Sequence, residues 1–78
     1  MDAIEFFRSL VGLDISEAKK KLGYWWVCEA CQTNPPLAWY HFYRAAGGQV
    51  VLHTENNIVK SQLHNRMALV YQERDLKH

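Results

Sequence analysis

The first part of the chain shows the apolar spacing of two short helices. In residues 1–11 and again in residues 14–23, apolar side chains recur at intervals of three and four and so share one helical face. The side chains concerned are Ala3, Ile4, Phe7, Leu10 and Val11 in the first segment, and Ile15, Ala18 and Leu22 in the second. Each segment opens with an aspartate followed three residues later by a glutamate, and a glycine follows each, which are start and stop signals of helices. The pattern predicts two short N-terminal helices.

The middle of the chain changes to the residue types of strands. Residues 24–31 and 37–44 are rich in large aromatic and β-branched side chains, and the loop between them contains Pro35-Pro36. Residues 49–54 form a third such run after a glycine-containing turn. We therefore expect a three-stranded antiparallel sheet. Neither face of its second strand is polar, so both faces are expected to be covered.

Residues 58–75 fit two structures. Read as a helix that begins at a cap on Asn57, the segment places five of its seven larger apolar side chains on one face. Read as strands, residues 55–57 and 64–65 become hairpin turns and the apolar side chains from Met67 to Tyr71 alternate. We predict one α+β domain over residues 1–78, with two N-terminal helices, a three-stranded sheet and a C-terminal helix. Further β-hairpins in place of that helix are the alternative.

Composition adds limits on size and partners. The chain has 78 residues and a formal net charge of +1. A domain this small buries only about 60% of the surface that its unfolded chain exposes, so its stability margin is narrow. The balanced charge disfavours duplex nucleic acid and anionic membranes. The sequence has no apolar run of membrane-spanning length and an acidic start, from which we expect a cytoplasmic protein.

Two cysteines provide the clearest candidate chemistry. Cys28 and Cys31 are separated by two residues, and a regular strand would point them to opposite faces, so a shared metal requires a bent backbone. Residues 26–34, Trp-Val-Cys-Glu-Ala-Cys-Gln-Thr-Asn, resemble the first half of the Ran-binding-protein type of zinc finger. That resemblance implies a zinc ion and binding of single-stranded RNA or ubiquitin. The chain has no second cysteine pair, so His41 and His53 are the candidates to complete a zinc site with the two cysteines.

Signatures of catalysis are missing from the sequence. It contains no glycine-rich phosphate loop, no G-x-S-x-G turn and no H-E-x-x-H helix, and its glutamates are scattered. We therefore predict a protein that is not an enzyme and has no cofactor other than a possible zinc ion.

Aromatic residues suggest binding instead. Seven of the ten aromatic residues fall between residues 24 and 43. Aromatic side chains and arginine dominate protein–protein hot spots, and aromatic platforms also stack on single-stranded bases. The predicted binding residues are Trp25, Trp26, Trp39, Tyr40, Tyr43 and Arg44. We predict a small module that binds a protein partner or a second copy of itself, with a zinc-stabilised binding domain and a single-stranded nucleic-acid binder as alternatives.

Overall fold

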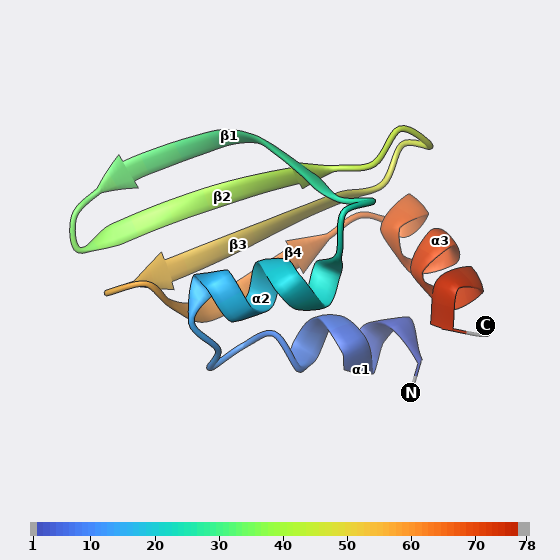
Figure 1. The fold of residues 1–78 in the computed structure, drawn as a ribbon, viewed down its shortest axis with the longest axis horizontal. Helices are drawn as coiled ribbons and strands as arrows, with labels where there is room; N and C mark the ends of the chain where they lie inside the picture. The colour runs from blue at the N-terminus through green and yellow to red at the C-terminus, as the bar shows by residue number, and fades with distance from the viewer. Residues whose placement is uncertain (1, 77–78) are drawn as a thin grey trace.

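The computed structural model describes residues 2–76, which form an α+β fold. In chain order its elements are α1 (Ala3–Arg8), α2 (Ile15–Leu22), β1 (Val27–Asn34), β2 (Leu37–Tyr43), β3 (Gln49–Glu55), β4 (Ile58–His64) and α3 (Arg66–Leu76). The strands form one antiparallel sheet in the order β1-β2-β3-β4 (Figure 1). The two N-terminal helices and the C-terminal helix are confirmed, but the sheet has four strands rather than the three predicted.

Both N-terminal helices begin at the predicted aspartates. The Asp2 carboxylate accepts a hydrogen bond of 2.8 Å from the backbone N–H of Glu5. The Asp14 carboxylate accepts bonds from the hydroxyl and the backbone N–H of Ser16, at 2.7 and 2.9 Å. These two bonds, the hydroxyl first, lower the pKa of Asp14 because they stabilise its ionised form. The caps thus satisfy amide groups that a helix start would otherwise leave unpaired.

Strand β4 corrects the prediction for the C-terminal third. Asn56 and Asn57 have φ angles of +53° and +67°, the left-handed conformation that asparagine tolerates in two-residue hairpin turns. The turn brings Ile58–His64 back along β3, so the helix predicted from Asn57 is wrong over this segment. The alternative of a hairpin turn at residues 55–57 is confirmed. Its strand over residues 67–71 is wrong, because helix α3 begins at Arg66.

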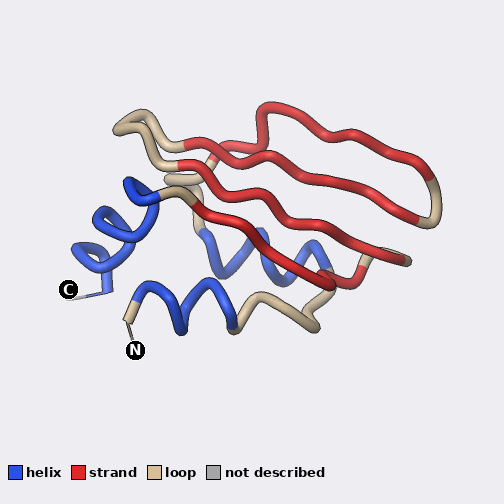
Figure 2. The backbone as a smooth tube through the Cα atoms, turned by 180° about the vertical axis from the view of Figure 1, so that it is seen from behind, coloured by secondary structure: helices blue, strands red, loops and turns tan. Residues whose placement is uncertain are grey.

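All three helices pack toward one face of the sheet. Figures 1 and 2 show α1 and α2 running along the β3–β4 side, and both helices contact β4. The buried core contains Ala3, Phe6, Phe7, Leu10, Ile15, Ala18, Leu22, Trp26, Phe42, Val50, Leu52, Val59 and Ala68. No described element covers the opposite face, so the expectation that both faces of β2 are covered is wrong.

Helix α3 is fastened at its first turn by Asn65. The Asn65 side-chain oxygen accepts hydrogen bonds from the backbone N–H groups of Ala68 (2.9 Å) and Gln49 (3.0 Å). Its side-chain nitrogen donates to the backbone carbonyl of Gly47 at 3.0 Å. One side chain therefore caps the helix and ties it to the β2–β3 turn. Within residues 2–76, no helix is long and apolar enough to cross a membrane.

Candidate interaction surface

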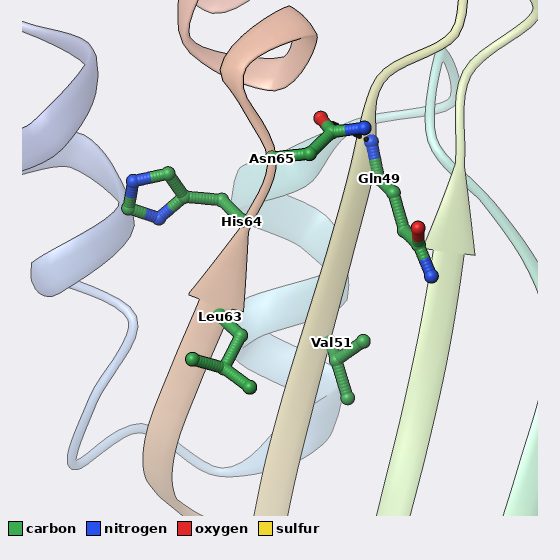
Figure 3. Close-up of a pocket in the computed structure, with 5 residues that line it drawn as sticks. All are labelled: Gln49, Val51, Leu63, His64 and Asn65. Carbon is green, nitrogen blue, oxygen red and sulfur yellow. Dashed lines mark hydrogen bonds between the residues drawn. The ribbon is translucent and has the colours of Figure 1, made fainter.

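The uncovered face of the sheet carries the candidate site, and we call it the open face. Its central side chains are Trp39, His41, Tyr43, Val51, His53 and Leu63. The register pairs Trp39 with His53 and pairs Val51 with both His41 and Leu63, so these side chains share one face as cross-strand neighbours. Figure 3 shows Val51 and Leu63 side by side on β3 and β4, while His64 points away toward α1.

The centre of the open face carries no acid, lysine or arginine and is partly accessible. Leu63 is 72% exposed, and the other five central side chains are half-buried. None of the six is an acid, a lysine or an arginine, and β2 contains no such residue at all. The hollow between Val51 and Leu63 has a volume of about 250 Å³, slightly below the roughly 300–1,000 Å³ of typical small-molecule pockets. The hollow is therefore small for a small-molecule pocket.

Two histidines on the open face have incomplete hydrogen bonding. The rings of Trp39 and His53 stack with their centroids 4.7 Å apart and their planes inclined by 19°. The Nε2 atoms of His41 and His53 are buried and have no hydrogen-bond partner among the described residues. Buried polar atoms are usually paired, because an unpaired one loses its bond to water without replacement. The two nitrogens are thus enclosed by the chain's own side chains without a hydrogen-bond partner among the described residues.

An exposed aromatic pair lies next to this surface. The rings of Tyr24 and Trp25 stack at a centroid distance of 4.5 Å, and the two residues are 80% and 58% exposed. After the buried Trp26 comes Val27, which pairs with Tyr43 and is itself 55% exposed. The accessible apolar surface thus continues from the open face to the start of β1.

Three of the six predicted binding residues lie elsewhere. Trp26 is in the core, only 5% exposed, and its indole N–H donates to the side-chain oxygen of Gln72 at 3.1 Å. The Arg44 guanidinium lies over the Trp26 ring, 5.1 Å from the ring centroid. Tyr40 pairs with Leu52 on the helix-covered face. The open face therefore contains Trp39 and Tyr43 from the predicted set, with Trp25 beside it.

The predicted metal ligands are divided between the two faces. Cys28 and Cys31 pair with Phe42 and Tyr40, on the helix-covered face. His41 and His53 belong to the open face. The described residues contain no group of three or more His, Cys, Asp or Glu side chains placed to hold a metal ion. The four residues therefore do not meet in one tetrahedral site.

The sequence interpretation missed Val51 and Leu63 as surface residues. Leu63 was assigned to the apolar face of a helix, because its spacing from Val59 and Met67 fits a helical period. The alternative with a hairpin turn at residues 55–57 places Leu63 correctly, because the Asn56-Asn57 turn dipeptide is directly followed by the residues of β4.

Comparison of the chain with protein-family models, curated proteins and solved structures gave no match. A proposal for its function therefore depends on the geometry of the open face and of the cysteine pair.

Proposed function

We propose that the protein is a non-enzymatic interaction module that associates with a second copy of itself through the open face. The observation that carries the proposal is a sheet face with an uncharged, aromatic centre over which no described element packs. Covering such side chains is favourable by about 25 cal/mol for each Å² of apolar surface removed from water. Trp39 and Tyr43 supply the largest rings of this face.

A second copy suits this face because the face is complementary to itself. It has no charge at its centre that would select a partner of opposite charge, and two such sheets can pack at about 10 Å separation as in a β-sandwich.

The size of the face sets the expected strength. Four strands about 4.8 Å apart and seven residues long at about 3.3 Å each give a face of roughly 440 Å² in projection. Two such faces total roughly 900 Å² in projection, which corresponds at most to the lower end of the about 1,200–2,000 Å² of accessible surface that standard stable interfaces bury. We therefore expect reversible association in the micromolar to millimolar range rather than a permanent dimer.

The test is the oligomeric state over a wide concentration range. Sedimentation velocity on the full chain should show a monomer at low concentration and a dimer as the concentration rises. Leu63→Lys should abolish the dimer, because it places a charge at the most exposed apolar position of the open face. Ile4→Lys is the matched control, since Ile4 is 42% exposed on α1, away from that face.

Either of two results would overturn the proposal. One is a chain that stays monomeric at millimolar concentration, which would leave a different protein as the remaining occupant of the face. The other is a Leu63→Lys variant that is folded by circular dichroism and dimerises as strongly as the parent chain.

The two alternatives from the sequence receive no specific support. A stacking platform for single strands needs cations for the phosphates, and no paired position of the open face carries lysine or arginine. The zinc-stabilised domain needs a site that joins thiolates and imidazoles, and the two groups lie on opposite faces.

A further inference from the structure

A β-bulge in β1 brings the two cysteines to the same face of the sheet. Cys28 pairs with Phe42, but the next paired residue, Ala30, faces His41, so Glu29 is an extra residue in the strand. After the bulge, Cys31 pairs with Tyr40. Phe42 and Tyr40 are two positions apart on β2 and share a face, so Cys28 and Cys31 share it too. In a regular strand the two cysteine side chains would point to opposite faces, and the bulge at Glu29 places them on the same face instead.

Both thiols are free and accessible at this position. All eight residues of β1 are exposed, because the helices cover the sheet on its β3–β4 side and leave the edge strand uncovered. The neighbouring residue on β2 is Tyr40, whose pKa is raised first by burial and then by its contact with the Cys31 thiol. The Lys19 ammonium lies over the Tyr40 ring, 5.1 Å from its centroid.

We propose that Cys28 and Cys31 form a binding site for one monovalent copper ion. Thiolates are soft ligands that favour Cu(I). Unlike zinc, Cu(I) forms stable complexes with only two thiolate ligands. A structural zinc site uses four protein ligands, which the described residues do not bring together here. On binding, each thiol releases its proton and each sulfur donates an electron pair to the copper, so two protons leave for every ion bound. The resulting complex carries a net charge of −1, and the closest cation placed beside it is the Lys19 ammonium over the ring of Tyr40, which pairs with Cys31.

The spacing of the two side chains favours a metal bridge over a disulfide. Cys28 and Cys31 lie opposite Phe42 and Tyr40, which are two positions and therefore about 6.6 Å apart along β2. A disulfide holds its sulfurs about 2.05 Å apart and needs Cβ atoms within about 4.5 Å. Two metal–sulfur bonds of about 2.3 Å each allow the sulfurs to lie up to about 4.6 Å apart. The metal therefore spans the pair with less distortion of the strand.

The proposal is tested by titrating the reduced full chain with Cu(I), supplied anaerobically as its acetonitrile complex, against a coloured Cu(I) chelator. We expect one copper ion for each chain. Cys28→Ser and Cys31→Ser should each lower the affinity by more than about 100-fold, beyond the usual effect of losing a group that only supports a ligand. Lys19→Ala should weaken binding by only about two- to fivefold, the effect of one exposed charge.

A relocated cysteine provides the matched control. The double variant Cys31→Ala, Gln32→Cys keeps two thiols in β1, but residue 32 pairs with Trp39 on the open face. This variant should lose copper binding as fully as Cys31→Ser does. The proposal is overturned if the parent chain takes no copper from the chelator, if the relocated variant binds as tightly, or if one ion is shared by two chains. Uptake of Zn(II) without uptake of Cu(I) would overturn it as well.

Discussion

Trp26 shows how strongly one side chain can join distant parts of this small domain. Its indole N–H bonds to Gln72, 46 positions further along the chain, and both residues are about 95% buried. Its ring packs edge-to-face with the ring of Phe7, at a centroid distance of 6.2 Å. It also lies so close to Gly48 that a Cβ atom added there would be 2.9 Å from a carbon of the tryptophan ring. The sequence placed this tryptophan among the binding residues, but its contacts are those of a core residue.

We predict that Trp26→Phe lowers the free energy of unfolding by about 1–3 kcal/mol. The smaller ring leaves a space in the core, and the side-chain oxygen of Gln72 loses its buried donor. Urea denaturation followed by circular dichroism measures the change. Trp25→Phe is the control, because Trp25 is 58% exposed and its substitution should change stability by less than about 0.5 kcal/mol. Equal losses in both variants would contradict the core assignment of Trp26.

At the scale of elements, the ends of some helices and strands follow from neighbouring residues in the sequence, whereas the ends of others depend on tertiary contacts. The capped helices and the three runs of strand residues were predictable because each follows from nearby residues. Strand β4 was predicted only as the alternative to a helix, because its apolar spacing fits both structures and its pairing depends on distant groups. The backbone N–H and C=O of Val59 bond to Leu13 and Gly12, in the loop between α1 and α2. These contacts hold β4 at the sheet edge.

The candidate sites were predictable to different degrees. Alternation along β2 correctly put Trp39, His41 and Tyr43 on one face. Whether that face is covered depends on where the helices pack, and local sequence patterns do not predict helix packing. The bulge at Glu29 was likewise hidden, since the residues around it favour a strand whether or not one residue is left unpaired.

Helix α3 offers a prediction about the docking of a whole element. Asn65→Ala removes the helix cap and both links to the β2–β3 hairpin, and we expect it to cost about 1–2 kcal/mol. Asn65→Asp keeps the accepting oxygen and loses only the donation to Gly47, so its cost should be smaller. Hydrogen exchange of the α3 amides reports the release of the helix directly. An alanine variant with unchanged protection would show that Asn65 does not hold the helix.

At the scale of the molecule, the two proposed sites share one cause. Two short helices and the start of a third cannot cover four strands, so they cover the β3–β4 side and leave β1 and the entire opposite face accessible. The open face and the cysteine pair both lie in this uncovered surface. Because a domain of this size has a narrow stability margin, small energetic changes where the helices do meet the sheet should affect the whole molecule.

His64 provides such a contact and makes global stability depend on pH. Its ring stacks on Phe7 of α1 at a centroid distance of 5.0 Å, and burial first, then the charge of Arg8, lowers its pKa below the usual value of 6.5. The unfolded chain therefore binds more protons at this residue than the folded one does. Stability is consequently lost as the pH falls through 6.5 toward the lower pKa of the folded state, and it is regained above 6.5.

We predict that the urea midpoint of the parent chain falls as the pH is lowered from about 7.5 to about 5.5, a range that includes the usual histidine pKa. His64→Phe keeps an aromatic ring against Phe7 and removes the titrating group, so its midpoint should fall less over the same range. Protonation of the other groups affects both chains alike and cancels in the difference. Parallel pH dependences in the two chains would show that protonation of His64 does not oppose folding, and would exclude this residue as a source of acid sensitivity.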